Sequence, residues 1–217
     1  MLPSRPVKTR QVLPIVLMIV FALTRIPGVL PENFSAVYGL LFCCGVYMTG
    51  RMAWWLPLAT MAVTDIGLNL YYQLALDVDA FKPYLLFNYA AYVVLIWLGR
   101  RFTARASWLA LLGGGIMGAI LFYLITNTAA WFFNPFGNPE YTKDLTGWII
   151  ALTRGTAGYP ATVEFFRNTL LSGGLFTGLF AGAMKLFAAP EEQESEEEEP
   201  AEEPAESPAP EPTDANG

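Results

Sequence analysis

Residues 107–133 read SWLALLGGGIMGAILFYLITNTAAWFF, and this stretch decides the fold class. It contains no charged residue. A transmembrane helix needs about 20 consecutive, mainly apolar residues to cross the roughly 30 Å hydrocarbon core of a bilayer, and an uncharged run of this length is typical of such a helix. The stretch therefore predicts one membrane-spanning helix.

Five further apolar segments lie on either side of it, at residues 12–23, 34–49, 54–72, 83–99 and 160–187. Each reaches or approaches the length that spans a bilayer. Together they predict an all-α integral membrane protein built as a six-helix transmembrane bundle. A seventh apolar segment, at 144–152, is too short to span. It predicts a surface helix between the fifth and sixth spans, on the extracellular side.

The charges divide the chain into a body and a tail. Residues 188–217 contain 12 of the 19 acidic residues and no base, so the other residues carry a net charge of +6. Only 15% of the chain is charged, against about 25% in ordinary soluble domains, which argues against a soluble enzyme. We predict a basic cytoplasmic N-terminus at 1–11, the transmembrane domain at 12–187, and a disordered, acidic cytoplasmic tail at 188–217.

The sequence contains few of the residues and motifs that bind metals or cofactors or that carry out redox chemistry. It contains no His, and its two cysteines, Cys43 and Cys44, are adjacent within an apolar segment. No nucleotide-binding loop or nucleophile motif is present. We therefore predict no enzymatic activity, no cofactor, no metal and no nucleic-acid partner. A membrane-embedded enzyme that uses Asp65 and Glu164 as a reactive pair is kept as an alternative.

Lys and Arg residues predict how the bundle is oriented. With the N-terminus inside, the six spans place eight bases on the inner side and four on the outer side, as the positive-inside rule expects. Both termini are then cytoplasmic, in a multi-pass protein of the bacterial inner membrane. The inner bases are Arg5, Lys8, Arg10, Arg51, Arg100, Arg101, Arg105 and Lys185, and the outer ones are Arg25, Lys82, Lys143 and Arg154.

Polar residues within the spans are candidate ligand-binding groups, because an ionisable side chain at mid-helix costs roughly 2.5–3.5 kcal/mol on insertion scales. Counted at about 1.5 Å per residue, they fall at one level in the outer part of four spans. This predicts an outward-open cavity with a net charge near −1, suited to a neutral polar or cationic small molecule. The candidates are Asp65 and Asn69, Asn88, Asn127 and Trp131, and Glu164, Arg167 and Asn168, with Glu164 and Arg167 spaced to form an ion pair.

A structural role for these polar residues is the alternative. Interhelical hydrogen bonds in membranes contribute about 0.6 kcal/mol each on average, and the protein would then be a membrane scaffold or assembly protein without a ligand. Small residues spaced by four allow helices to pack closely in lipid. The glycines at this spacing are Gly114 and Gly118 in one span, and Gly174, Gly178 and Gly182 in another.

Several short motifs follow one another in an order typical of a known group of proteins. They are Thr64-Asp65, Leu98-Gly99-Arg100, Thr126-Asn127-x-x-x-Trp131, the loop from Tyr141 to Gly147, and Phe165-Phe166-x-Asn168-Thr169-Leu170-Leu171. Over residues 12–187 the chain resembles an uncharacterised bacterial family of small membrane proteins described only as transport proteins. That family is similar to the substrate-binding S components of energy-coupling-factor (ECF) vitamin transporters.

The resemblance implies an S-component-like bundle that captures a small molecule from outside for uptake. The implied substrate is a small polar compound of the vitamin or cofactor-precursor type. The implied partners are the lipid bilayer and an ECF-type coupling subunit with its ATPases, which would supply the energy.

Overall fold

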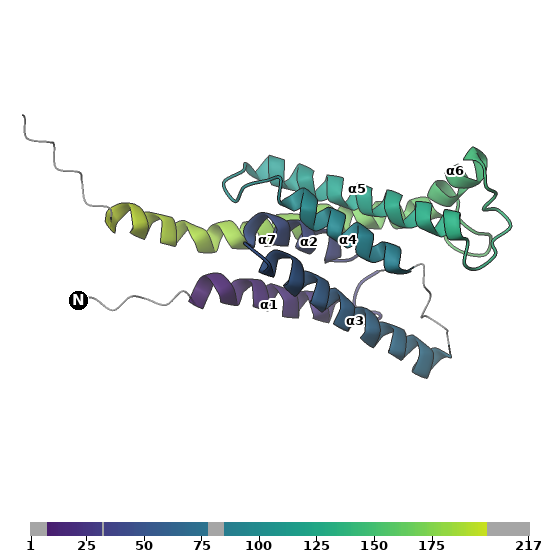
Figure 1. Cartoon of the computed structure of the whole chain (residues 1–217), viewed down its shortest axis with the longest axis horizontal. Helices are drawn as coiled ribbons and strands as arrows, with labels where there is room; N and C mark the ends of the chain where they lie inside the picture. The colour runs from purple at the N-terminus through teal and green to yellow at the C-terminus, as the bar shows by residue number, and fades with distance from the viewer. Residues whose placement is uncertain (1–7, 32, 78–84, 199–217) are drawn as a thin grey trace, which may run out of the picture.

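The computed structural model describes residues 8–31, 33–77 and 85–198, with side chains for 16–31, 33–77 and 85–186. This part of the chain forms seven α-helices and no strand, which confirms the all-helical class (Figure 1). The helices are α1 (Lys8–Thr24), α2 (Val37–Tyr47), α3 (Met52–Leu76), α4 (Leu86–Gly99), α5 (Trp108–Phe133), α6 (Leu145–Thr153) and α7 (Thr162–Glu198).

The core forms around α2, which packs against α4, α5 and α7. Residues Val37 to Gly45 are all buried, so α2 has no face turned to the surroundings. Its sequence contains no charged residue, and a helix that is apolar on every side is expected to be enclosed by its neighbours. Helices α1 and α3 pack at the side of this core, where α1 contacts α2, α3 and α7.

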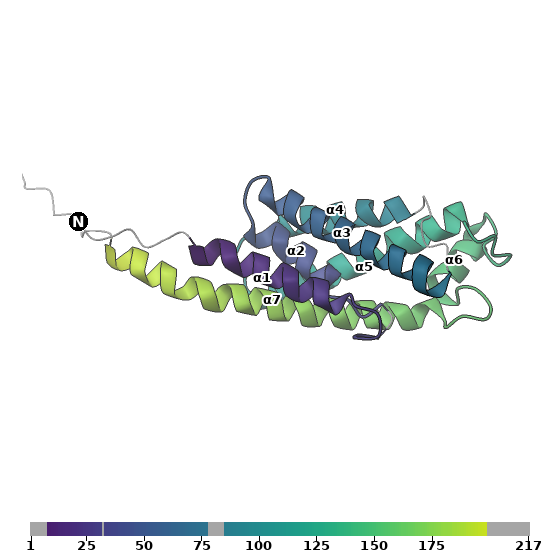
Figure 2. The same cartoon turned by 90° about the horizontal axis from the view of Figure 1, so that it is seen from below.

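The start of α1, the end of α7 and the basic α4–α5 loop lie at one end of the bundle, opposite α6. Figures 1 and 2 both show the start of α1 and the end of α7 at one end of the molecule, and α6 at the other. Lys185 of α7 donates a hydrogen bond to the backbone oxygen of Ala106, 2.9 Å away in the α4–α5 loop. The loop that contains Arg100, Arg101 and Arg105 therefore lies at the end where α7 leaves the bundle.

Two described helices are long and apolar enough to cross a membrane, namely Trp108–Phe133 and Thr162–Leu186. Helices α2 and α4 are apolar but have only 11 and 14 residues, so α2 is about 16 Å long. Two candidate spans are fewer than the six predicted. The segment expected at 34–49 is shortened because Met48 is extended (φ −91°, ψ 146°) and Gly50 takes a positive φ of +60°.

The last helix is longer than the sequence suggested. Disorder was predicted from residue 188, whereas α7 continues to Glu198. Ala and Glu are good helix formers, and extending an existing helix requires no new nucleus. The tail from 199 to 217, residues 1–7 with Arg5, and the loop that contains Lys82 lie outside the described residues.

The surface helix predicted at 144–152 is α6, at Leu145–Thr153. Asp144 precedes its first residue as the N-cap, and the Oδ1 of Asp144 accepts a hydrogen bond from the Gly147 backbone N–H at 2.7 Å. This is the usual way in which an aspartate caps a helix N-terminus. Trp148 Nε1 then donates to Thr128 Oγ1 at 3.0 Å, which fixes α6 against α5.

Candidate functional site

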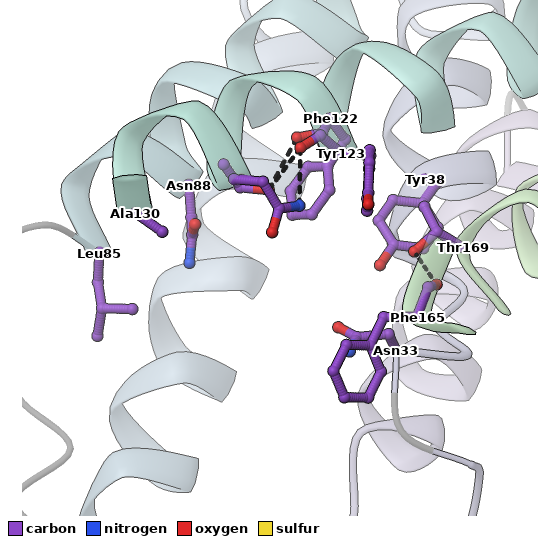
Figure 3. Close-up of a pocket in the computed structure, with 11 residues that line it drawn as sticks. Asn33, Tyr38, Leu85, Asn88, Phe122, Tyr123, Ala130, Phe165 and Thr169 are labelled. Carbon is purple, nitrogen blue, oxygen red and sulfur yellow. Dashed lines mark hydrogen bonds between the residues drawn. The ribbon is translucent and has the colours of Figure 1, made fainter. Parts of the chain in front are cut away.

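A cavity of about 260 Å³ lies between α2, α4, α5, α7 and the segment that precedes α2 (Figure 3). We call it the amide cavity, because Asn33, Asn88 and Asn127 line it. Figure 3 shows Asn88 on one side of the open space and Tyr38 and Thr169 across from it. Four helices and one irregular segment therefore contribute to a single small polar site.

A second cavity of about 660 Å³ adjoins the first. We call it the arginine cavity, because Arg25 lines it together with Pro27, Ser35 and other residues of the segment between α1 and α2. The two cavities share Asn33, Tyr38, Asn88 and Phe122. Pockets that hold small molecules usually have about 300–1,000 Å³, so the pair has room for such a ligand.

Three side chains of the amide cavity present oxygens that can accept hydrogen bonds. Asn127 donates one Nδ2 hydrogen to the backbone oxygen of Tyr123 at 2.9 Å, which leaves its side-chain oxygen as an acceptor and its second N–H as a donor. The hydroxyls of Thr126 and Thr169 donate to the backbone oxygens of Phe122 and Phe165, both at 2.9 Å. Each of these hydroxyl oxygens retains acceptor capacity after donating its one hydrogen.

Aromatic rings form the wall between the cavities. The ring of Phe122 lies 4.9 Å from that of Tyr38 and 5.8 Å from that of Tyr92, measured between centroids. The rings of Phe122 and Tyr92 are nearly parallel, with an interplanar angle of 13°. A site with apolar walls and a few convergent polar groups is the common form of a small-molecule pocket.

An ion pair stands beside the arginine cavity. Arg25 Nη2 lies 2.5 Å from Asp65 Oδ1, and the other carboxylate oxygen, Oδ2, accepts from the Tyr89 hydroxyl at 2.9 Å. Both side chains of the pair are about four-fifths buried. Lipid-facing charges are costly, and charged groups in a bundle are therefore expected to pair in this way.

The comparisons with known proteins give a family but no activity. Residues 6–196 match the model of a family of unknown function, DUF6580. The chain belongs to this family. No curated protein and no solved structure matches it.

The structure separates the predicted ligand residues of this DUF6580 member into two groups. Asn88 and Asn127 line the amide cavity. Asp65 instead faces Arg25 and Tyr89, and neither Asp65 nor Asn69 lines either cavity. The sequence placed Asp65, Asn88 and Asn127 at the same depth in their helices, but depth alone does not show which of them point into the cavity.

Trp131 has a role at the end of α5, away from both cavities. Its Nε1 donates to the backbone oxygen of Thr142 at 2.7 Å. Lys143 Nζ donates to the backbone oxygens of Trp131 and Phe132 at 2.6 Å and lies 5.5 Å from the centre of the Trp131 ring. Trp131 therefore fixes the loop that leads into α6.

The three candidates on α7 also lie outside both cavities. Glu164 and Arg167 are exposed, and Asn168 is half-buried. The one ion pair among the described residues joins Arg25 and Asp65, so the predicted pair between Glu164 and Arg167 does not form. Asp65 is bonded to Arg25 and Tyr89, whereas Glu164 is exposed.

Residues that the sequence analysis did not select complete the site. Arg25 and Asn33 come from the irregular segment between α1 and α2, and Tyr38 and Thr169 come from helix faces that look ordinary in the sequence. One signal was available for Arg25, since it is a lone base directly after an apolar run and close to Pro27. Its pairing with Asp65, 40 positions away, required the tertiary structure.

The predicted glycine positions differ in how closely they are packed. A Cβ on Gly114 would overlap the Phe42 ring, at 2.5 Å. A Cβ on Gly182 would make a tight contact of 3.2 Å with the Trp108 ring. At Gly118, Gly174 and Gly178 a Cβ would make ordinary contacts of 3.5 to 3.7 Å. The closest backbone approaches between two of the long helices occur elsewhere, at Gly39, Gly45 and Gly99. Helix α2 therefore meets α4 and α7 through glycines that the spacing rule did not select.

No group of three or more His, Cys, Asp or Glu side chains in the described part of the chain is placed to hold a metal ion. Cys43 and Cys44 are free thiols on α2, buried in the hydrophobic core of the bundle. The groups that can act on a small molecule are accordingly the amides, hydroxyls and aromatic rings of the two cavities, with Arg25.

Proposed function

We propose that this protein is a multi-pass membrane protein that captures a small polar molecule in the joined amide and arginine cavities for uptake. The observation that carries the proposal is the convergence of Asn33, Asn88 and Asn127, together with Thr126 and Thr169, on one cavity between four helices. Asn88 and Asn127 are half-buried and Asn33 is exposed, so their amide groups are accessible to a molecule that enters the cavity. A ligand that hydrogen-bonds to them would explain why they are gathered there.

The proposed arrangement has six crossings of the bacterial inner membrane, with both termini in the cytoplasm and α6 outside. Its support is the position of the start of α1 and the end of α7 at one end of the bundle, opposite α6 (Figures 1 and 2). The basic loop of Arg100, Arg101 and Arg105 lies at the same end as the end of α7, as the hydrogen bond from Lys185 requires. Lys and Arg are enriched in cytoplasmic loops.

The shortness of α2 is compatible with such a bundle. Non-helical backbone at membrane depth is tolerated where it lines a cavity or is covered by protein. The segment between α1 and α2 contributes Arg25, Asn33 and Ser35 to the cavity lining. Its irregular backbone would therefore form the floor or rim of the site and would not face lipid.

Energy for uptake would come from a partner module or from an ion gradient, because the sequence contains no ATP-binding motif. An ECF-type coupling subunit with its ATPases remains the proposed partner, on the sequence resemblance alone. Co-purification of the chain with such subunits from its own membranes would test this separately from ligand binding.

The test of ligand capture is mass spectrometry of small molecules that co-purify with the detergent-solubilised protein. Asn88→Leu and Asn127→Leu remove a cavity amide at nearly constant volume, and Asn69→Leu is the matched control, because Asn69 lies in a helix but outside both cavities. We expect a bound molecule in the wild type and in Asn69→Leu, and its loss in the other two variants.

A scaffold would give a different result in the same experiment. No small molecule would co-purify with any form, and Asn88→Leu and Asn127→Leu would lower the melting temperature at least as much as Asn69→Leu does. That outcome would refute ligand capture and assign the amides to helix packing.

A further inference from the structure

We propose that the captured molecule carries a carboxylate and that Arg25 binds it. This inference rests on the function proposed above and names the chemical class of its ligand. Arg25 is the single charged residue among the described residues that line the two cavities. Its partner Asp65 does not line either cavity.

The bonds of Asp65 suit a positioning role. One of its oxygens accepts from Arg25 Nη2 and the other from the Tyr89 hydroxyl. Both oxygens are therefore engaged by groups of the protein. A carboxylate held in this way orients the guanidinium and offers little to a cationic ligand.

The guanidinium has donors beyond those used by this pair. It carries five N–H groups in a planar fork that matches the two oxygens of a carboxylate. Its bonds within the protein go to Asp65 Oδ1 from Nη2 at 2.5 Å, and to the Met61 sulfur from Nη1 at 3.6 Å. These two bonds use two of the five N–H groups, and the sulfur is only a weak acceptor.

The charge of the lining differs from the expectation from the sequence. A net charge near −1 was predicted from Asp65, Glu164 and Arg167, but Glu164 and Arg167 are exposed and none of the three lines the cavities. The described lining instead carries one charged group, Arg25, whose charge is balanced by its pair with Asp65. What the cavity offers a ligand is therefore the remaining N–H donors of the guanidinium, which suit an anionic acceptor and cannot bind a cation.

The amide cavity defines the other end of the ligand. The side-chain oxygens of Asn127, Thr126 and Thr169 act there as acceptors, as their hydrogen bonds to the helix backbone show. They would pair with hydrogen-bond donors. The ligand class is therefore a small carboxylate that also carries a hydroxyl or an amine.

The probes are acids of this class, each paired with its own amide: lactate with lactamide, 3-hydroxybutyrate with 3-hydroxybutyramide, and serine with serinamide. Each amide keeps the shape and loses the carboxylate charge. Inorganic phosphate is a further probe. Binding is measured by the shift of the melting temperature in detergent and by isothermal titration calorimetry. We expect at least one acid to bind the wild type about tenfold or more tightly than its amide, because charge-assisted hydrogen bonds are the strong ones.

Variants then assign the effect to Arg25. The double variant Arg25→Gln/Asp65→Asn removes both charges together and leaves no unpaired buried charge, so it is expected to fold. It should bind the acid no better than the amide, while Arg167→Gln, which removes an exposed arginine, should bind like the wild type. Asp65→Asn keeps a side-chain oxygen that can accept from Arg25 and orient it, while it removes the carboxylate that competes for the guanidinium, so it should bind the acid as tightly as the wild type or more tightly. Glu164→Gln is its control and should have no effect.

Four results would overturn the inference. They are equal binding of acid and amide, binding of phosphate but of no carboxylate, no binding of any acid, and full acid binding by the double variant. The proposed function is tested separately, because a co-purifying molecule that Asn127→Leu loses would establish capture even if that molecule is uncharged.

Discussion

The contact between α2 and α4 gives the sharpest test of the packing. A Cβ on Gly45 would lie inside van der Waals distance of the Ile96 backbone oxygen, 2.9 Å from Gly99 Cα and 3.0 Å from the Arg100 nitrogen. All three atoms belong to the backbone of α4 and its C-terminal cap, so no side-chain rotation can relieve the overlap. In Gly45→Ala the two helices must move apart before an ordinary contact is restored.

Two opposing effects set the change in the free energy of unfolding that Gly45→Ala causes. Extra volume in a well-packed core costs typically about 1–3 kcal/mol, and an overlap with backbone belongs to the upper part of that range. Gly→Ala in a helix otherwise stabilises by roughly 0.5–1 kcal/mol. The matched control is Gly113→Ala in α5, where a Cβ would meet nothing within 4 Å and only the stabilising effect operates.

Thermal unfolding in detergent, followed by circular dichroism, compares the two variants. Their difference is the cost of overlap, about 1–3 kcal/mol, and 1 kcal/mol shifts the melting temperature by roughly 2–4 °C for a chain of this size. We expect Gly113→Ala to melt at or above the wild type, and Gly45→Ala to melt about 6–12 °C below Gly113→Ala, from the upper part of that range. Equal melting temperatures would refute the close approach of α2 and α4.

Three further predictions concern topology, the tail and α6. Thr103 and Thr146 are both exposed. A cysteine placed at position 103 should react with a membrane-impermeant thiol reagent only after the membrane is opened, whereas one at position 146 should react in intact cells. Labelling of position 103 in intact cells would contradict the proposed orientation. A chain that ends after Ala189 should keep the membrane yield and melting temperature of the full chain, because the sequence beyond it has no apolar face to bury, and a large loss of either would show that the tail packs on the protein. The hydrogen bonds from the Gly147 backbone and Thr142 hold the pKa of Asp144 below its ordinary 3.8, so their contribution is present above that pH and is lost as pH falls through the lower, folded pKa. The protection of the Gly147 amide, meaning its exchange rate relative to the intrinsic rate at the same pH, should then fall at low pH in the wild type but not in Asp144→Asn, whose side-chain oxygen still caps α6 at every pH. An equal fall in both would exclude the carboxylate as its cause.

Local patterns predicted what depends on neighbours in sequence. The apolar runs gave helices within a few residues of α1, α3, α5 and α6, because a helix satisfies its own backbone hydrogen bonds and needs only a suitable composition. Two helix ends differ from the apolar runs: an extended Met48 ends α2 shortly before the end of the run at 34–49, and α7 continues well beyond the run at 160–187, to Glu198. Both differences concern helix ends, where a small change in local conformation decides the boundary.

The amino-acid sequence by itself determined the helical class, the separation of an apolar body from an acidic tail, and two of the cavity amides, Asn88 and Asn127. Hydropathy and charge carry that information because they act residue by residue. The tertiary structure alone decided which polar groups meet. It brings Arg25 to Asp65 across 40 positions and turns Asn33 and Thr169 toward the cavity, while Glu164 and Arg167 stay exposed. Helical periodicity fixes the face of a side chain on its own helix, but the rotation of that helix against its neighbours is set by packing, here by the glycines through which α2 meets α4 and α7.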